Sequence, residues 1–221
     1  MTITTAQPRP VTHDVIDPAI LYFGTPVVLL ATVGSDGAPN LAPMSSVFWL
    51  GSTAVIGMGG RSLTARNLLA TGECVLNLPS ADQVDAVDRL ALTTGRADVP
   101  EGKHAAGYRH VPDKLAHADL TGVSAETVGA PRVAECPVNL EGRVVAHRPL
   151  AGTEHDEDPT WIFDVAISRV HVHPEIRAQG HANRIDPDRW RPLLMSFQQF
   201  YGLGARVSPS RLATIDEEWY R

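Results

Sequence analysis

Hydrogen-bond donors gather around one glycine-rich turn near the middle of the first half of the chain. Gly57-Met58-Gly59-Gly60 is followed by Arg61 and Ser62, and then by Thr64 and Asn67. Ser62 is a good helix N-cap, and a helix beginning there directs unpaired backbone N–H groups and the positive end of its dipole at the turn. Arg61 adds a charged, forked donor, and the glycines let a ligand approach the backbone. These residue types favour binding of a phosphate monoester.

A purely structural interpretation of the same turn stands beside this one, because capped helices after glycine turns are common. The glycines do not form a dinucleotide fingerprint, since a third glycine is missing and no βαβ unit surrounds them. They do not form a Walker loop either, because no Gly-Lys-Ser/Thr ending follows. The turn therefore predicts an anion site of a kind that these two motifs do not describe.

The elements that must position this turn are a strand over 53–58, a helix from Ser62 and a strand that ends at 77. Gly72 lies where the left-handed glycine after a helix belongs. Upstream, the apolar run within 26–33 is typical of a strand covered on both faces, and Asp36-Gly37 indicates a hairpin turn. A second strand is expected over 41–50, so Pro43 must lie at a sheet edge or a bulge.

Downstream elements continue the same pattern. Ser80 to Gln83 is a capping box that begins a helix, and we expect that helix to end at Gly95. Residues 100–131 read as a long excursion with one or two short helices around 114–118, either a lid over a ligand or surface padding. The run 136–146 predicts a strand kinked at Gly142, and 161–171 alternates like a half-buried antiparallel strand. Strands in hairpin order with inserted helices predict a mainly β fold, an antiparallel barrel with α additions.

This pattern divides the chain into three parts. We expect a flexible N-terminal arm over 1–13, a barrel domain over 14–188, and a C-terminal tail over 189–221. Aromatic and leucine side chains in the tail follow a roughly helical spacing, so we expect it to be helical and to pack on the barrel or on a second subunit.

Composition excludes several classes of partner. A formal net charge of -6 argues against nucleic acid and anionic membranes as partners. The absence of a long apolar run and of a signal-like start predicts a cytoplasmic protein that does not enter a membrane. Cys74 and Cys136 then read as buried thiols, with a disulfide or metal pair as the alternative. His171 and His173 share a strand face but lack a third ligand, so we expect surface or interface histidines and no metal site.

Several ordered segments resemble the flavin reductase-like family of FMN-binding split barrels, which includes flavoredoxin-type proteins. The similarity covers about residues 22–188. The segments that carry it are Ala42-Pro43-Met44-Ser45-Ser46, Arg61-Ser62-Leu63-Thr64-Ala65-Arg66-Asn67, Glu73-Cys74-Val75-Leu76-Asn77, Cys136-Pro137-Val138-Asn139-Leu140-Glu141, residues 167–173 and Arg184-Ile185-Asp186.

The resemblance implies an antiparallel, Greek-key-like split β-barrel that binds FMN and accepts a hydride from NAD(P)H. It implies that Arg61, Ser62, Thr64 and Asn67 hold the phosphate and ribityl chain. It also implies that Pro43, Met44, Ser45 and Ser46 meet the edge of the flavin ring. Because the flavin carries the chemistry in such proteins, no catalytic side chain is expected.

The resemblance leaves the biological role open between three classes. The chain is expected to be a flavin reductase that serves a small-molecule electron acceptor or a partner oxidoreductase. The alternatives are a non-catalytic FMN electron carrier and a barrel that has kept the fold but lost the cofactor. The family also implies a homodimer with the flavin near the subunit interface, and the aromatic side chains near the C-terminus support a buried contact there.

Overall fold

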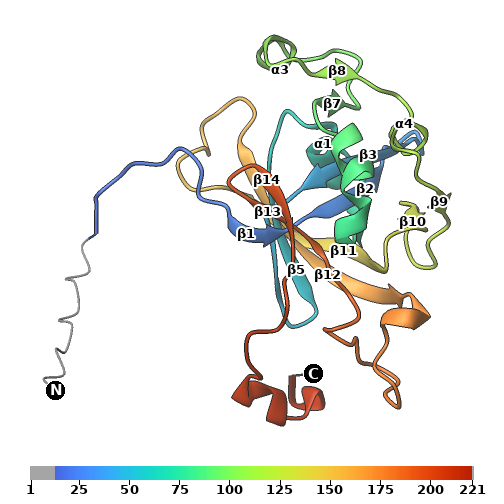
Figure 1. Cartoon of the computed structure of the whole chain (residues 1–221). Coiled ribbons are helices and arrows are strands. Elements are labelled where there is room, and N and C mark those ends of the chain that lie inside the picture. The colour runs from blue at the N-terminus through green and yellow to red at the C-terminus, as the bar shows by residue number, and fades with distance from the viewer. Residues whose placement is uncertain (1–12, 221) are drawn as a thin grey trace, which may run out of the picture.

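The computed structural model describes residues 13–220, so nearly all of the expected N-terminal arm lies outside the described residues. The chain is mainly β, as predicted, and its largest sheet is antiparallel with seven strands in the order β3-β2-β6-β11-β12-β5-β4. Figure 1 shows this sheet with α1 beside it and an inserted segment at one end. The strands of this sheet are β2 (Val28–Val33), β3 (Pro39–Met44), β4 (Val47–Leu50), β5 (Thr53–Gly59), β6 (Glu73–Leu78), β11 (Val138–Pro149) and β12 (Thr160–Val172).

The two edge strands of the sheet, β3 and β4, are neighbours in sequence. Only Ser45 and Ser46 join them, so the sheet must curl until its opposite edges approach each other. No ladder pairs β3 with β4 in the described part of the chain, and the barrel is therefore not closed. The expectation of one continuous strand over 41–50 is wrong, because the chain leaves one edge at Ser45 and enters the other. Pro43 lies on the edge strand β3, as predicted, together with Pro39.

Both faces of the sheet are covered, which explains the continuous apolar run of β2. Leu29 and Ala31 belong to one hydrophobic cluster, whereas Val28 and Leu30 belong to another. Successive side chains of a strand point to opposite faces, so each face of β2 has its own core. The alternation predicted for β12 is confirmed, since Phe163 and Val165 are fully buried in the second cluster.

Local signals set the ends of α1 (Leu63–Thr71). The Ser62 hydroxyl accepts a hydrogen bond from the Ala65 N–H at 3.1 Å, and Gly72 adopts a left-handed φ of 68°. Both predicted caps are confirmed. The capping box at Ser80 and Gln83 is also present, and it begins η1 (Ala81–Gln83) and α2 (Val84–Arg89). That helix ends at Arg89 and not at Gly95, because the chain turns after Leu90 into β7 (Thr93–Thr94).

The excursion over 100–131 is built from short elements. They are α3 (Glu101–Ala105), β8 (Arg109–His110), α4 (Lys114–Ala118) and β9 (Gly122–Val123), with β10 (Arg132–Val133) just beyond. The predicted short helix at 114–118 is confirmed. A parallel pairing of β7 with β8 ties the start of the excursion to the chain before it. Figure 1 places α3 and α4 near α1 and β3, over one end of the large sheet.

A buried carboxylate holds the far end of the excursion. Glu141 on β11 is 0% exposed, and it accepts hydrogen bonds from the Glu126 N–H at 2.9 Å and from the Thr127 N–H at 2.6 Å. His171 on β12 approaches the same carboxylate with Nε2 at 2.6 Å from Oε1. The His171 side chain is only 18% exposed, so the expectation of a surface position is wrong, while a position at an interface stays a prediction.

The tail is the part of the fold that sequence reasoning misread. Instead of a helix, β13 (Leu193–Ser196) and β14 (Gln199–Gly202) form a hairpin that pairs with β1 (Phe23–Pro26) in a three-stranded sheet. Beyond it lie η3 (Arg211–Thr214) and η4 (Glu217–Tyr220), while η2 (Pro174–Ile176) follows β12. Phe197 and Gln198 form the two-residue turn of this hairpin, and both have positive φ. The roughly helical spacing of the tail aromatics therefore belongs to two strands and the turn between them.

Candidate functional site

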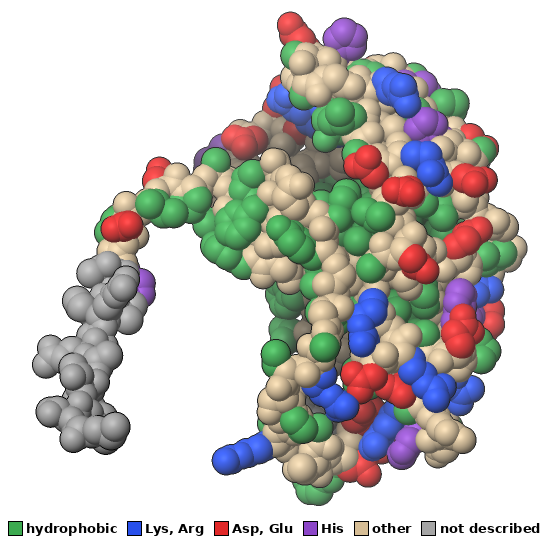
Figure 2. Space-filling view, viewed as in Figure 1, with side chains coloured by type: hydrophobic (Ala, Val, Ile, Leu, Met, Phe, Trp, Pro, Cys, Tyr) green, Lys and Arg blue, Asp and Glu red, His purple; other side chains and the backbone are tan. Residues whose placement is uncertain are grey.

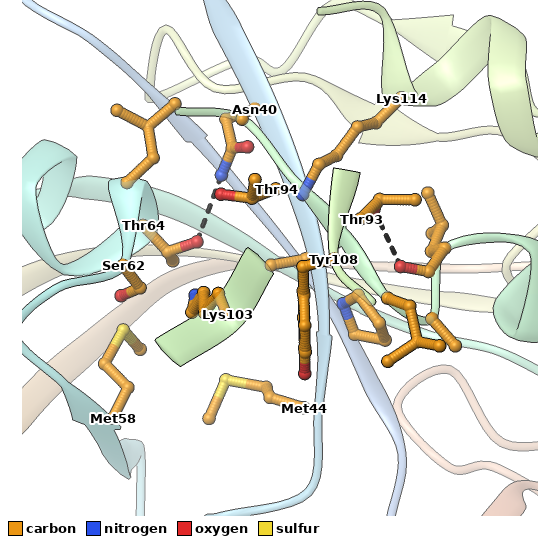
Figure 3. Close-up of a pocket in the computed structure, with 17 residues that line it drawn as sticks. Asn40, Met44, Met58, Ser62, Thr64, Thr93, Thr94, Lys103, Tyr108 and Lys114 are labelled. Carbon is orange, nitrogen blue, oxygen red and sulfur yellow. Dashed lines mark hydrogen bonds between the residues drawn. The ribbon is translucent and has the colours of Figure 1, made fainter. Parts of the chain in front are cut away.

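A hollow of about 200 Å³ lies where the N-terminus of α1 meets β3 and the excursion. Figure 3 shows the side chains that surround it. Four parts of the chain build its wall: the edge strand β3, Met58 near the end of β5, the first turn of α1, and the run from Leu90 to Lys114 that includes β7 and α3. The predicted anion site at the start of α1 therefore opens into a real cavity. The residues that line it are Asn40, Ala42, Pro43, Met44, Met58, Ser62, Leu63, Thr64, Leu90, Ala91, Leu92, Thr93, Thr94, Gly95, Lys103, Tyr108 and Lys114.

Ser62 and Thr64, two of the predicted phosphate ligands, line this hollow. The Ser62 hydroxyl is committed to capping, because it accepts from Ala65 and donates to the Gly59 carbonyl at 2.9 Å. What the turn offers a ligand is backbone: Leu63 and Thr64 begin the helix, so their N–H groups have no helical acceptor. The Thr64 hydroxyl accepts from Asn40 Nδ2 at 3.0 Å and keeps its own proton for donation.

Arg61 and Asn67 do not line the hollow. Arg61 is at the rim, where its Nε lies 3.3 Å from an Asp158 carboxylate oxygen and its side chain is 62% exposed. Asn67 is buried one turn further along the same face of α1 and donates from Nδ2 to the Thr32 hydroxyl at 3.1 Å. The structure thus brings together two of the four predicted phosphate ligands and separates the other two from them.

The predicted ring-edge residues divide in the same way. Pro43 and Met44 line the hollow, whereas Ser45 and Ser46, in the link between the two edge strands, do not. The hydroxyl of Ser46 lies 2.9 Å from the phenol oxygen of Tyr22, which precedes β1. The link therefore lies just outside the hollow, with its hydroxyl bonded to a tyrosine that sequence reasoning did not select.

Sequence reasoning also missed Lys103, Tyr108 and Lys114, which the excursion contributes to the wall. Figure 3 shows the amino group of Lys114 directed toward Asn40 and Thr94. The sequence did contain a signal for these residues. The chain has only two lysines against 17 arginines, and both lysines line this hollow.

The electrostatic potential of the hollow is positive, because Lys103 and Lys114 line it. Burial, and then the charge of Lys103, lowers the pKa of Lys114 from 10.5 to about 8. Burial, and then the charge of Arg96, also lowers the pKa of Lys103. Arg96 lies outside the wall, bonded to Asp98, and its Nη1 donates to the Arg61 carbonyl at 3.1 Å. That bond ties the segment between β7 and the excursion to the turn before α1.

One acceptor in the wall has no partner. Asn40 Oδ1 is buried without a hydrogen bond among the described residues, next to Gly95, where a Cβ atom would lie only 2.5 Å away. A buried acceptor left unpaired costs free energy unless a ligand donates to it. The wall thus combines donors for an anion with one acceptor for a hydroxyl or amide, as a phosphorylated polyol requires.

Comparison with known proteins identifies the family of this chain. Residues 20–204 match the family model described as a flavin reductase like domain. The uncharacterized protein YdfE of Bacillus subtilis (strain 168) is 33% identical over 195 residues, which are 87% of this chain and 90% of that protein. Within residues 13–220, no helix has the length and apolar character needed to cross a membrane.

Two solved structures share the fold. Flavoredoxin of Desulfovibrio vulgaris (Miyazaki F) is 19% identical with a TM-score of 0.72, and the match covers 92% of this chain and all of that chain (100%). Nitrilotriacetate monooxygenase component B from Bacillus cereus is 21% identical with a TM-score of 0.71, and the match covers 90% of this chain and 100% of that chain. Because the family model spans most of the sequence, the chain belongs to the flavin reductase-like family.

Proposed function

We propose that this chain binds FMN with its ribityl phosphate in the hollow, and that it acts as an NAD(P)H-dependent flavin reductase. The observation that carries the proposal is that one cavity contains both the free N–H groups at the start of α1 and the unpartnered acceptor Asn40 Oδ1. The first suits a phosphate and the second suits a hydroxyl of the chain attached to it. A hollow of about 200 Å³ is too small for a whole flavin, so the ring would lie outside it, beside Met44.

In this proposal the N–H groups of Leu63 and Thr64 and the Thr64 hydroxyl donate to the phosphate. Arg61 lies on the outer side as an exposed cation, and Asn67 anchors α1 to β2 through its bond to Thr32. Backbone and hydroxyl groups at 43–46 would meet the ring edge. When bound, the flavin supplies the centre that accepts the hydride, so no side chain has to form a covalent bond.

FMN is proposed over FAD because the turn provides one anion site and no second glycine-rich cradle follows it. The electron acceptor would be a small molecule or a partner oxidoreductase, and a component of a monooxygenase shares the fold. We place this reaction in the cytoplasm, where buried free thiols such as Cys74 and Cys136 are the rule.

The test starts with the absorption spectrum of the purified protein. Heat release and chromatography should identify FMN, and FAD as the main species would contradict this part of the proposal. Anaerobic titration with NADH and NADPH should then bleach the flavin band within seconds. A flavin that stays oxidised with both donors, yet is reduced by a protein electron donor, would favour the electron-carrier alternative.

A further inference from the structure

The two lysines of the chain are placed as a pair in one cavity without acidic neighbours. Lys114 is only 6% exposed, and its side chain makes no hydrogen bond or ion pair with any residue from 13 to 220. Lys103 contacts the Tyr108 ring, with Nζ 5.3 Å from the ring centroid. No aspartate or glutamate lines the hollow. An ammonium on a largely buried side chain with no carboxylate partner is costly, so an apolar side chain would be better for stability at this position unless a ligand supplies the missing charge.

The groups that face Lys114 from the surrounding elements are few. The first turn of α1, β3 and β7 present only neutral side chains to the hollow. The excursion presents Lys103 and the phenol of Tyr108. On α4 itself, Asp113 accepts from the Ala116 N–H at 3.0 Å and so caps the helix, outside the lining of this hollow.

The remaining charges near α4 are occupied elsewhere. Helix α2 packs against α4, and its Arg89 donates from Nη2 to the Ala118 carbonyl at 2.6 Å. His117 on α4 places Nε2 3.1 Å from the Arg89 carbonyl. None of these side chains lines the hollow, so Lys103 and Lys114 dominate its potential.

We propose that Lys114, with Lys103, selects a dianionic phosphate ester over its unphosphorylated form, and that Lys114 takes up a proton when this ligand binds at alkaline pH. The organic part of the ligand rests on the proposed function, but the anion does not. The choice of lysine supports the proposal: an arginine cannot release its proton near neutral pH, whereas a buried lysine can.

The direction of the pH dependence follows from the charge on Lys114. Its pKa of about 8 in the free protein leaves the amine charged at pH 7 and largely neutral at pH 9. A bound dianion raises that pKa, because an opposite charge favours the ammonium form. Binding above pH 8 therefore draws a proton from solvent, and affinity should fall up to about tenfold per pH unit until the pKa of the complex is reached.

Stability supplies an independent signature. The pKa of Lys114 is lower in the folded than in the unfolded chain, so the charged form destabilises the ligand-free fold at pH 7. Lys114→Met should therefore raise the thermal midpoint of the ligand-free protein at pH 7 while it weakens phosphate binding. A residue with a merely structural role would lower the midpoint when replaced.

The experiment uses the full-length, ligand-free protein with FMN, riboflavin and inorganic phosphate as probes, at pH 7.0, 8.0 and 9.0. At pH 7, Lys114→Met should weaken FMN binding by about ten- to a hundredfold and leave riboflavin binding unchanged. Lys114→Arg should keep the FMN affinity of the wild type at pH 7 and lose most of its pH dependence. Arg66→Met, which removes an exposed cation of α1 outside the hollow, is the control for a general charge effect.

Because the chain has only two lysines, NMR of lysines labelled at Cε can follow the pKa of Lys114 directly. Inorganic phosphate should raise it, and Lys114→Met assigns the signal. The proposal is overturned if phosphate does not change the pKa of the Lys114 signal. It is also overturned if FMN binding to Lys114→Arg keeps the pH dependence of the wild type, or if Lys114→Met loses affinity for FMN and riboflavin equally. Absence of flavin binding would refute the proposed function alone, because the phosphate titration still decides the role of Lys114.

Discussion

Thr64 joins two walls of the hollow, since its hydroxyl accepts the bond from Asn40 Nδ2 while its N–H group belongs to the free first turn of α1. Asn40 is 6% exposed and Thr64 is 4% exposed, so the bond between them is largely shielded from bulk water. The Asn40 amide oxygen already lacks a partner, and the amide nitrogen is hydrogen-bonded to the Thr64 hydroxyl. A single hydroxyl thus connects the edge of the sheet to the helix terminus.

Thr64→Ala should therefore destabilise the ligand-free protein by about 1–3 kcal/mol, because it leaves the buried Asn40 nitrogen unpaired. Thr64→Ser, which keeps the hydroxyl, is the matched control, and its free energy of unfolding should fall much less. Urea unfolding followed by tryptophan fluorescence measures both variants. Equal stability of Thr64→Ala and the wild type would mean that the Asn40 amide finds another partner.

Glu141 gives a second prediction at the scale of one residue. Burial by itself raises the pKa of this carboxyl, but hydrogen bonds from Thr127, Glu126 and His171 overcome burial and lower the pKa to about 2. Because the folded pKa lies below the unfolded value, the carboxylate stabilises the fold above about pH 4.5, and this contribution is lost as pH falls toward 2.

Glu141→Gln should cost on the order of 3 kcal/mol at pH 7 and progressively less as the pH falls below 4. Unfolding in urea at pH 7, 5 and 3.5 measures that convergence. Asp113→Asn is a control, because that exposed carboxylate caps α4 and lies outside this network. A cost that stays constant from pH 7 to 3.5 would assign the loss to packing and not to the charge.

At the scale of elements, α1 shows how far local signals reach. Its N-cap, its C-terminal glycine and the strands around it were predicted, because each depends on side chains within a few residues of one another. The tail was misread because Phe197 and Gln198 make a hairpin turn at positive φ without the Asn-Gly sequence that marks such turns. The lysines of the excursion were missed because the long-range placement of this segment, including the packing of α4 against β3, decides what they face.

Alanine substitutions at two glycines separate backbone strain at Gly72 from steric overlap at Gly142. Gly72 has a φ of 68°, and a Cβ atom there would meet nothing nearer than 3.9 Å. Gly72→Ala should therefore cost about 1 kcal/mol through backbone strain alone. At Gly142, where the register of β11 shifts, a Cβ atom would lie 2.5 Å from Val165 Cγ1 and 3.1 Å from the Ala166 carbonyl.

Gly142→Ala should be the more destabilising of the two, by about 1–3 kcal/mol, because the fully buried Val165 has little room to move. Thermal unfolding of both variants gives the comparison. Gly37→Ala, at a turn with a φ of 78° and open space around the added carbon, controls for a change in φ alone. If Gly142→Ala lost less stability than Gly72→Ala, β11 and β12 would have to separate easily at the register shift.

On the scale of the whole molecule, the three-stranded sheet of β1, β13 and β14 carries an exposed apolar surface. Phe23 is 68% exposed and Phe197 is 48% exposed, and their rings meet edge to face at 4.8 Å. Tyr201 on β14 is 55% exposed. Figure 2 shows hydrophobic side chains gathered over this part of the molecule. Such a surface is the best candidate for the contact of the homodimer that the family resemblance implies.

We expect a homodimer by light scattering at low micromolar concentration, and a monomer for the double variant Phe23→Thr, Phe197→Asn. Threonine keeps the β propensity of β1, and asparagine tolerates the left-handed φ of position 197, so the sheet should persist. Val145→Thr, at an exposed position of β11, is the control and should stay dimeric. A double variant that remains dimeric would place the contact elsewhere.

The two prolines of β3 have a consequence for how the chain avoids self-association. Pro39 and Pro43 stand four residues apart, so they share one side of the strand, and neither has an N–H group to offer an incoming strand. That edge of the sheet resists growth by β-strand addition, the first step toward fibrils. The opposite edge, β4, has the sequence Val-Phe-Trp-Leu with no proline, and its Phe48 and Leu50 are exposed. We therefore expect a partly unfolded chain to aggregate through β4, whereas β3, the edge that borders the hollow, resists the addition of another strand.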